Sequence, residues 1–331
     1  MYVCFSNRGA DVFVWGFMLP FQNRQPGESV FKAEKERNMK KRILAMLMTG
    51  IMVLGMAGAV QAEEKDKVEI QVFIAASLNT VMTEIAEKYN EEHPEVEIVY
   101  NADSSGTLLT QIQEGYACDI FFSAAQKQMN TLEEDGLLVE GTRADVVNNQ
   151  VVVITLKDSG TKVTGLETLG DAESIALADG SVPVGRYTRT ALMNLGILDK
   201  VEDASAYTTA EVSEALGGVE ISEQGNVNKV LAAVTEGSCE VGTTYYSDTY
   251  GYEDDVEILE KVSYDLTGNV IYPIAQVVNE EASDEETAAA ADFLAYVLSD
   301  EAKAIFDSYY FDTNLEKEEA AETVASSAEA K

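Results

Sequence analysis

Apolar positions follow two different periods along residues 68–311, and each period predicts its own kind of element. Short runs rich in Val, Ile and Phe between polar turn residues predict buried strands. Apolar residues that recur every three or four positions predict amphipathic helices. The expected strands are 68–75, 96–102, 119–123, 151–155, 174–178, 241–245 and 272–278. The expected helices lie between Ser77 and His93, between Thr107 and Gly115, and at 187–195, 227–236, 286–298 and 299–309.

Strands that alternate with helices predict an α/β fold, in which a mostly parallel sheet is flanked by helices on both faces. The chain has 331 residues, which is long enough for two domains. The pattern suggests that the chain leaves one lobe near Asn149 and returns near Ile271. We therefore expect two lobes joined by two crossing strands, with lobe I formed by 66–149 plus 272–312 and lobe II by 150–271.

The amino-terminal region has the pattern of a secretory signal peptide. Three basic residues, Lys40 to Arg42, precede an uncharged apolar run at 43–60, and a small-residue site ends at Ala62. We expect residues 39–62 to be the signal peptide, cleaved after Ala62. A membrane-spanning anchor is the alternative, since 18 apolar residues approach the length that spans a bilayer. Residues 1–38 are expected to be an upstream extension, with translation starting at Met39.

The segment that follows the apolar run bears on where the protein resides. No cysteine follows the apolar run, so the sequence offers no mature amino-terminal cysteine for a lipid anchor. The expected product is soluble and exported, to the periplasm or to the extracellular face of the cytoplasmic membrane.

At the carboxyl-terminal end, residues 313–331 are rich in Glu and Ala and are expected to be an acidic low-complexity tail.

Charge and composition exclude several functions. The formal net charge is −35, so a partner held by phosphate-backbone attraction is disfavoured and nucleic-acid binding is not expected. One histidine and three cysteines provide no spacing for a zinc cluster or a Cys/His catalytic pair. The sequence leaves open whether Cys118 and Cys239 are free thiols or a pair. No nucleophile elbow, phosphate-binding loop or dinucleotide fingerprint is present, so neither an enzyme nor a cofactor is expected.

Serine residues follow two of the expected strands at the point where a helix begins. Ser77 follows the first strand, and Ser104 and Ser105 follow the second. The start of a helix presents unpaired N–H groups and the positive end of the helix dipole, and a hydroxyl adds a donor, so these positions are suited to an anion. The alternative is that the serines are ordinary helix caps, because Ser is a preferred cap residue.

Five segments together resemble the molybdate-binding proteins of ABC importers. They occur in that family's order between residues 68 and 311, and they are Phe73-Ile74-Ala75-Ala76-Ser77-Leu78, Asp103-Ser104-Ser105-Gly106-Thr107-Leu108, Asp119-Ile120-Phe121-Phe122-Ser123-Ala124, Val182-Pro183-Val184-Gly185-Arg186-Tyr187 and Tyr245-Tyr246-Ser247-Asp248. The resemblance implies a two-lobed periplasmic-binding-protein fold that encloses an oxyanion between its lobes.

The resemblance also implies a ligand shell and a role. The shell consists of the hydroxyl and N–H groups of Ser77 and Ser105, the backbone N–H groups of Val184 and Val227, and the phenol of Tyr245. Molybdenum is then bound only as molybdate, through these residues. Val184 stands where the family usually has Ala, which changes little if only its N–H is used.

Molybdate and tungstate are fully ionised near neutral pH and only accept hydrogen bonds, so a neutral pocket of donors suits them. The expected function is an exported monomer that captures molybdate or tungstate and delivers it to a membrane permease. The alternative is a binding protein for another oxyanion such as sulfate or phosphate. Asp103 bears on that choice, because a carboxylate beside Ser104 would accept the proton of hydrogen phosphate.

Overall fold

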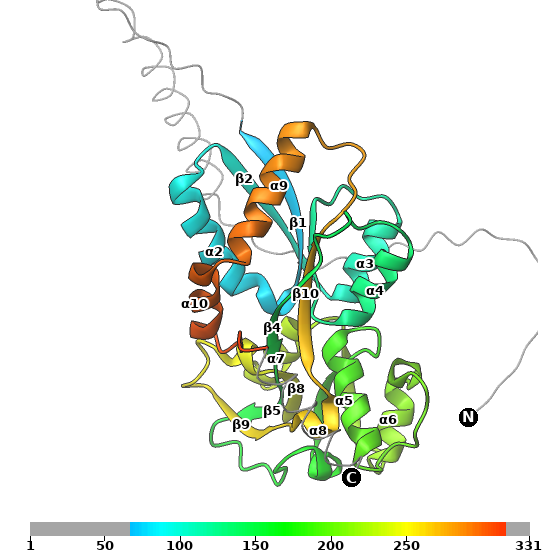
Figure 1. Ribbon diagram of the computed structural model, residues 1–331. Coiled ribbons are helices and arrows are strands. Elements are labelled where there is room, and N and C mark those ends of the chain that lie inside the picture. The colour runs from blue at the N-terminus through cyan, green and yellow to red at the C-terminus, as the bar shows by residue number, and fades with distance from the viewer. Residues whose placement is uncertain (1–66, 316–331) are drawn as a thin grey trace, which may run out of the picture. The chain divides into compact units, whose positions relative to one another are not determined.

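The protein forms two five-stranded sheets in a computed structural model that describes residues 67–315 (Figure 1). Sheet I has the order β2-β1-β3-β10-β4 and sheet II the order β7-β6-β8-β5-β9. The strands of sheet I are β1 (Val68–Ala75), β2 (Val96–Asp103), β3 (Ile120–Phe122), β4 (Ala144–Asn149) and β10 (Val270–Gln276). The strands of sheet II are β5 (Val151–Leu156), β6 (Ser174–Ala178), β7 (Glu220–Gln224), β8 (Val241–Tyr245) and β9 (Val256–Lys261).

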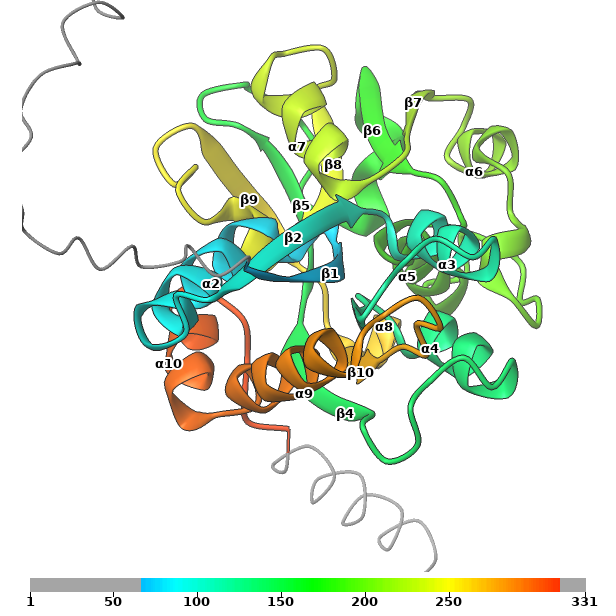
Figure 2. The same ribbon diagram turned by 90° about the horizontal axis from the view of Figure 1, so that it is seen from above.

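Helices cover both faces of each sheet, as Figures 1 and 2 show. The helices of lobe I are α2 (Asn79–Glu92), α3 (Ser105–Gln113), α4 (Gln126–Glu134), α9 (Asp284–Val297) and α10 (Asp300–Ser308). Those of lobe II are α5 (Pro183–Asn194), α6 (Thr209–Ala215), α7 (Val227–Thr235) and α8 (Tyr264–Thr267). Four 3₁₀ turns complete the described elements: η1 (Ala76–Leu78), η2 (Leu166–Asp171), η3 (Ala204–Ala206) and η4 (Tyr246–Thr249).

Alternation along β1 divides the core of lobe I. Phe73 packs with Leu108 of α3 and Met129 of α4, while Val72 and Ile74 belong to the larger cluster that also contains the buried residues of α2 and α9. Neighbouring residues of a strand point to opposite faces, so sheet I separates α3 and α4 from α2, α9 and α10. Figure 2 shows these two groups of helices on either side of the sheet.

Both sheets are mixed, which corrects the expectation of mostly parallel sheets. In sheet I, β1 pairs in parallel with β2 and β3, whereas β10 is antiparallel to β3 and β4. In sheet II, β6 is parallel to β7 and β8, whereas β5 is antiparallel to β8 and β9. The strand that runs against the others is β10 in sheet I and β5 in sheet II, and each directly follows one of the two crossings between the sheets. The α/β class and the two lobes are confirmed.

The chain crosses between the sheets twice, once between Asn149 and Val151 and once between Lys261 and Val270. An isolated bridge between Asn148 and Asp312 adds the segment after α10 to the first crossing. The crossings lie beside each other because β4 and β10 are neighbours in sheet I, with Val270 opposite Asn149.

Several boundaries differ from the expectation for identifiable reasons. Helix α5 begins at Pro183 rather than at 187, because proline is well suited to the first helical position. Strand β7 was not expected, because its sequence Glu-Ile-Ser-Glu-Gln is polar and lies largely exposed at the edge of sheet II. Helix α4 was not expected either, since Gln126 to Glu134 buries only three side chains.

The structure also bears on two questions that the composition raised. Cys118 and Cys239 are both buried free thiols. Between residues 67 and 315, no helix is long and apolar enough to cross a membrane. The proposed extension 1–38, the signal peptide 39–62 and residues 316–331 of the tail lie outside the described residues.

Candidate functional site

A small cavity lies between the lobes, and all five residues that the resemblance implies for the site contribute to its lining. Its volume is about 10 Å³, measured as the space open to the centre of a water molecule. Its lining consists of Ala75, Ala76, Ser77, Ser104, Ser105, Ala124, Val182, Pro183, Val184, Asn226, Val227 and Tyr245. The lining segments follow the carboxyl ends of β1, β2, β6 and β7, with Tyr245 at the end of β8. Ligands of α/β folds commonly bind at this end of parallel strands.

The start of α3 assigns different roles to its two serines. Ser104 is the N-cap, since its hydroxyl oxygen accepts a hydrogen bond from the Thr107 N–H at 3.2 Å. Ser105 is the first helical residue and is fully buried. Its hydroxyl oxygen accepts a bond from the Ala124 N–H at 2.9 Å, which leaves the hydroxyl proton available to another acceptor. The helix-cap interpretation therefore holds for Ser104 and is wrong for Ser105.

Ser77 lies in η1, immediately after β1, and it is not a helix cap. No side-chain cap bond forms at the start of η1 or of α2. The Ser77 hydroxyl lies 2.9 Å from the hydroxyl of Tyr272 in β10. The Tyr272 oxygen also accepts a hydrogen bond from the Asn149 side-chain amide at 3.1 Å. Ser77 is thus connected through one tyrosine to the point where the chain first crosses between sheets.

The start of α5 brings the N–H of Val184 to the cavity. Val184 lies in the first turn of the helix, where N–H groups have no partner within the helix. Gly185 permits this placement, because a Cβ there would lie 2.2 Å from the Asp179 carbonyl oxygen. Fully buried Arg189 fixes the same turn, donating to the carbonyl oxygens of Ala178 at 2.8 Å and Gly185 at 3.0 Å.

The start of α7 places Val227 at the cavity in the same way. Val227 is the first residue of the helix, and Asn226 is its N-cap through a bond from the Lys229 N–H at 3.1 Å. The side-chain amide of Asn226 also donates to the Asp103 carboxylate at 3.0 Å. Asp103 belongs to lobe I and Asn226 to lobe II, so this hydrogen bond joins the lobes beside the cavity.

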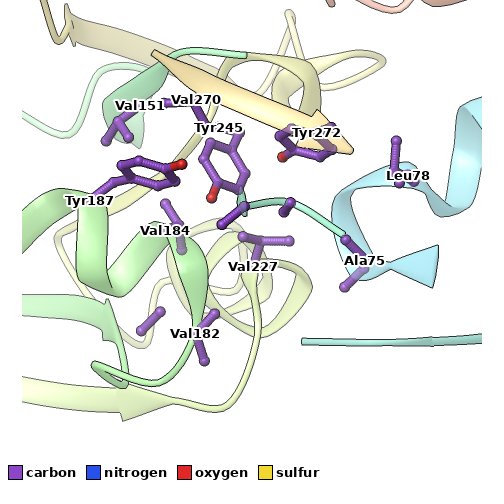
Figure 3. Packing of buried hydrophobic residues seen from close by; sticks show 14 of the residues in the cluster. Ala75, Leu78, Val151, Val182, Val184, Tyr187, Val227, Tyr245, Val270 and Tyr272 are labelled. Carbon is purple, nitrogen blue, oxygen red and sulfur yellow. The ribbon is translucent and has the colours of Figure 1, made fainter. Parts of the chain in front are cut away.

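Tyr245 is the most unusual member of the lining. Its side chain is 1% exposed, and its hydroxyl has no hydrogen-bond partner within the described chain. Burial, followed by the nearby Tyr272, raises the pKa of Tyr245 well above its ordinary value, so the phenol keeps its proton. Figure 3 shows the ring between Tyr187 and Tyr272, with the hydroxyl on the side that faces Val184 and Val227. The hydroxyl is therefore an unused donor at the cavity.

The cavity is neutral and its available groups are mainly donors. No Lys, Arg, Asp or Glu side chain within residues 67–315 contributes to its lining. Asp103 directly precedes the lining residue Ser104 and is not part of the lining itself; its Oδ1 accepts from the Ser104 N–H at 2.7 Å and from the Asn226 side-chain amide. In the same range, no cluster of three or more His, Cys, Asp or Glu is arranged for a metal ion.

Sequence reasoning missed four residues that shape the site. Asn149 and Tyr272 hold Ser77, Asn226 caps α7 and joins the lobes, and Arg189 fixes the start of α5. The apolar run of β10 indicates that Tyr272 is buried, but it does not indicate the partner of the hydroxyl. Asn226 had a usable signal, since Asn directly before an apolar helix is a common cap.

Comparison with known proteins places this geometry in a family. Residues 70–312 match the family model of the bacterial extracellular solute-binding proteins. The molybdate-binding protein ModA of Haemophilus influenzae is 29% identical over 279 residues, which cover 82% of this chain and 99% of that protein. A solved substrate-binding domain from Clostridium difficile is 31% identical, with a TM-score of 0.54, and the match covers 75% of this chain and 99% of that one.

Other relatives bind different oxyanions or share the fold alone. The periplasmic molybdate-binding protein of Azotobacter vinelandii has a TM-score of 0.60 at 20% identity, covering 73% of this chain and 98% of that one. The phosphate-binding protein PstS of Bacillus subtilis is 23% identical, covering 79% of this chain and 89% of that protein. The motif resemblance is confirmed, as are the expectations of a ligand in place of a cofactor and of a non-enzymatic role. The chain belongs to the bacterial extracellular solute-binding protein family, whose members are substrate-binding proteins of ABC transporters.

Proposed function

We propose that this protein binds molybdate or tungstate in the cavity between its lobes and delivers it to the permease of an ABC importer. One observation carries the proposal: the Tyr245 hydroxyl is buried at the cavity without a partner. A buried donor left unsatisfied costs about 1–3 kcal/mol, and an anion oxygen in the cavity would supply the missing acceptor. The molybdate-binding relatives support the choice of ligand.

The remaining donors fit an ion that only accepts hydrogen bonds. The hydroxyls of Ser77 and Ser105 and the first-turn N–H groups of α5 and α7 all belong to the lining. Helix N-termini stabilise anions without a formal positive charge, and burial strengthens each contact. The net charge of −35 opposes a dianion at long range, but salt screens that field beyond about 10 Å.

Sulfate and phosphate are the competing ligands, and the relatives include a phosphate-binding protein. Hydrogen phosphate carries a proton that needs an acceptor. The cavity lining contains no carboxylate within the described chain, since Asp103 lies outside it and is held at its Oδ1 by the Ser104 N–H and the Asn226 amide. Phosphate is therefore disfavoured by the chemistry of the lining. Sulfate accepts hydrogen bonds as molybdate does, so it must be discriminated by size and donor geometry.

Calorimetric titration with molybdate, tungstate, sulfate and phosphate tests the proposal. We expect molybdate and tungstate to bind more tightly than the other two ions. Tyr245→Phe removes the unused donor and should weaken molybdate binding by about 1.5–3 kcal/mol, the range for a hydrogen bond to a charged group. Tyr100→Phe is the matched control, because the Tyr100 hydroxyl donates to the Met82 carbonyl oxygen at 2.8 Å, away from the cavity lining. Tight phosphate binding would assign the cavity to another ligand. Equal losses of molybdate affinity in Tyr245→Phe and Tyr100→Phe would show that the Tyr245 hydroxyl does not bind the ion.

Delivery requires the protein to reach the outer face of the cytoplasmic membrane. We propose that residues 39–62 direct its export as a signal peptide and that the mature protein is a monomer. We further propose that residues 66–149 plus 272–312 and residues 150–271 act as two rigid lobes. Family membership and the absence of a membrane-spanning helix within residues 67–315 are compatible with this route.

A further inference from the structure

We propose that a second cavity, which shares Ser77 with the proposed anion cavity, binds a small organic cation that carries a primary ammonium group. Its volume is about 340 Å³, measured as the space open to the centre of a water molecule. Ala76 and Ser77 line both cavities, and the rest of the second lining comes from α2, α7, η4 and the segments that follow η4 and α10. A cavity of this size suits a small ligand.

Four aromatic side chains line the second cavity, namely those of Tyr250, Tyr252, Tyr309 and Phe311. The centroids of the Tyr250 and Tyr309 rings are 4.2 Å apart, and Tyr250 and Tyr252 are 38% and 40% exposed. The face of an aromatic ring carries partial negative charge and attracts a cation within about 6 Å of its centroid. These rings are therefore suited to an ammonium group with an aliphatic body.

The same group of rings already binds an ammonium group of the chain itself. Lys261 Nζ lies 3.2 Å from the centroid of the Tyr246 ring. Tyr246 stacks on Tyr310 at 4.7 Å between centroids, and Tyr310 contacts Tyr250 at 5.5 Å. Lys261 lies outside the lining of the second cavity, so it does not compete for the rings that the cavity presents.

The charged groups of the lining are acceptors for N–H donors. Glu236 and Asp248 contribute carboxylates, and no Lys, Arg or His within residues 67–315 lines the cavity. Both hydrogen bonds to the Asp248 carboxylate fall on Oδ2, so its Oδ1 can accept from a ligand. Glu236 is exposed at the end of α7 and has no ion-pair partner among the described residues. A primary ammonium group donates three hydrogen bonds, whereas an anion would be repelled by both carboxylates.

Equilibrium dialysis of the full chain against n-pentylamine and against 1-pentanol tests the proposal. The probes share an aliphatic body and differ in charge, because an alkylamine is protonated at neutral pH as a Lys side chain is. Molybdate is omitted, so the result does not depend on the anion cavity. Salt at about 0.15 M screens the general attraction of an amine to a chain of net charge −35. We expect pentylamine to bind with a dissociation constant of about 1 mM and pentanol to bind about tenfold more weakly.

Glu236→Gln and Tyr252→Leu identify the site. Each should weaken pentylamine binding about two- to fivefold, and the double variant about tenfold, because one removes a carboxylate and the other a ring face. Glu134→Gln is the matched control for charge, since Glu134 is likewise exposed at the end of a helix. Tyr116→Leu is the matched control for the ring, since Tyr116 is 59% exposed, and neither control residue lines the second cavity.

The proposal is overturned if pentylamine does not bind, or if it binds no more tightly than pentanol. It is also overturned if the two control variants lose as much affinity for pentylamine as the two cavity variants do, because the amine would then be held by the charge of the whole chain. The proposed binding of molybdate stands in each of these cases.

Discussion

Three hydroxyl groups at the cavity differ in what their oxygens already bind, and this difference determines what each can offer a ligand. The oxygens of Ser77 and Ser105 lie within bonding distance of protein donors, whereas the Tyr245 hydroxyl has no partner in the described chain. A hydroxyl whose oxygen accepts one hydrogen bond still has its proton to donate to another acceptor. At the residue scale, the site is thus prepared for an acceptor before any ligand arrives.

Ser77→Ala and Ser105→Ala should each weaken molybdate binding by about 1.5–3 kcal/mol, because each removes a hydrogen bond to a charged ligand. Their effects on folding should differ. Ser105→Ala leaves the buried Ala124 N–H without its acceptor and should cost about 1–3 kcal/mol of stability. Ser77 is only partly buried, so water can replace its contact to Tyr272 and the loss should be smaller. Calorimetry and chemical denaturation measure the two effects separately.

Ser299→Ala is the control for the serine variants. Ser299 is the N-cap of α10, where it accepts from the Ala302 N–H at 3.2 Å, and it does not line the cavity. Its removal should cost about 1 kcal/mol of stability and leave the affinity unchanged. If Ser77→Ala and Ser105→Ala behaved like this control, the serines would be structural and the assigned site would be wrong.

Asp248 provides a prediction for the dependence of stability on pH. Burial raises its pKa to about 6, against the hydrogen bonds from Thr244 and from the Tyr245 N–H, which lower it. The ordinary pKa of an unfolded Asp is about 3.9, so the folded protein holds this proton more tightly. The resulting contribution to stability is complete below about pH 4 and is lost as the pH rises through about 6.

Asp248→Asn removes this titration, because the amide keeps an acceptor oxygen for the same two donors and does not ionise. We expect the free energy of unfolding of the wild type to fall relative to the variant between about pH 4 and pH 7, by roughly 1–3 kcal/mol. Urea denaturation of both proteins across this range measures the difference. If the free energies of unfolding of the two proteins changed in parallel with pH, the Asp248 carboxyl would not titrate between about pH 4 and pH 7.

At the scale of elements, the site is built from the starts of helices that follow parallel strands. Helices α3, α5 and α7 begin after β2, β6 and β7, and Tyr245 ends β8. Each start presents N–H groups that have no partner within the helix. Because parallel strands have their carboxyl ends at the same edge of a sheet, each lobe collects its donors at one edge, and the cavity lies where the two edges meet.

The sequence predicts the parts of this arrangement that depend on local pattern. Buried strands such as β1 and β8 are rich in β-branched and aromatic residues, so their positions follow from composition. Strand β7 and helix α4 escape prediction because both are polar and packed on one side only. Ser104 and Ser105 are adjacent and chemically identical, and only the position of Ala124 separates the cap from the candidate ligand residue. Tertiary contacts of this kind have no local pattern.

The hydrogen bond between Asp103 and Asn226 connects the starts of α3 and α7 across the lobes, so its removal should weaken ligand binding without disturbing either helix. Asn226→Ser keeps a capping oxygen for α7 and loses the amide that donates to Asp103. We expect a loss of molybdate affinity of about three- to tenfold, expressed mainly as faster release, because the bond holds the lobes together around the ligand.

Asp103→Ala should have a similar effect, and the double variant Asp103→Ala/Asn226→Ser should be no weaker than either single variant. The losses of affinity caused by substituting two residues that share one interaction do not add up, because the first substitution already removes that interaction. Stopped-flow release rates and calorimetry on the three variants complete the cycle. Additive losses would show that Asp103 and Asn226 act independently and that the contact does not couple the lobes.

At the scale of the whole described chain, lobe I and lobe II are in contact across the cavity. Besides the bond between Asp103 and Asn226, the Lys127 ammonium lies 2.6 Å from the Asp203 carboxylate. Both side chains are about half exposed, so this ion pair contributes little by itself. The backbones also approach closely, since a Cβ on Gly106 would lie 2.8 Å from the Ser181 carbonyl oxygen. These contacts hold the two lobes close together, and we expect the two crossings, near Asn149 and near Ile271, to act as a hinge when the lobes open.

Gly106 therefore allows a graded test of closure. Ala and Val at position 106 are better helix formers than Gly, so α3 and the ligand-free protein should not be destabilised. Added carbon atoms would, however, press against the Ser181 backbone and hold the lobes apart. If the ligand closes the lobes by binding the closed form more tightly, molybdate affinity should fall from wild type to Gly106→Ala to Gly106→Val, with a loss of about tenfold or more for Val.

Small-angle scattering gives the second measurement for the same variants. Molybdate should compact the wild type, compact Gly106→Ala less and leave Gly106→Val close to its ligand-free dimensions. Gly225→Ala is the control, because its added Cβ would meet only the mobile end of Lys229 at 3.3 Å. A Gly106→Val protein that binds and compacts like the wild type would show that ligand binding does not require the lobes to approach as closely as they do in this structure. Reduced affinity without reduced compaction would instead place the effect of Gly106 within α3, next to Ser105.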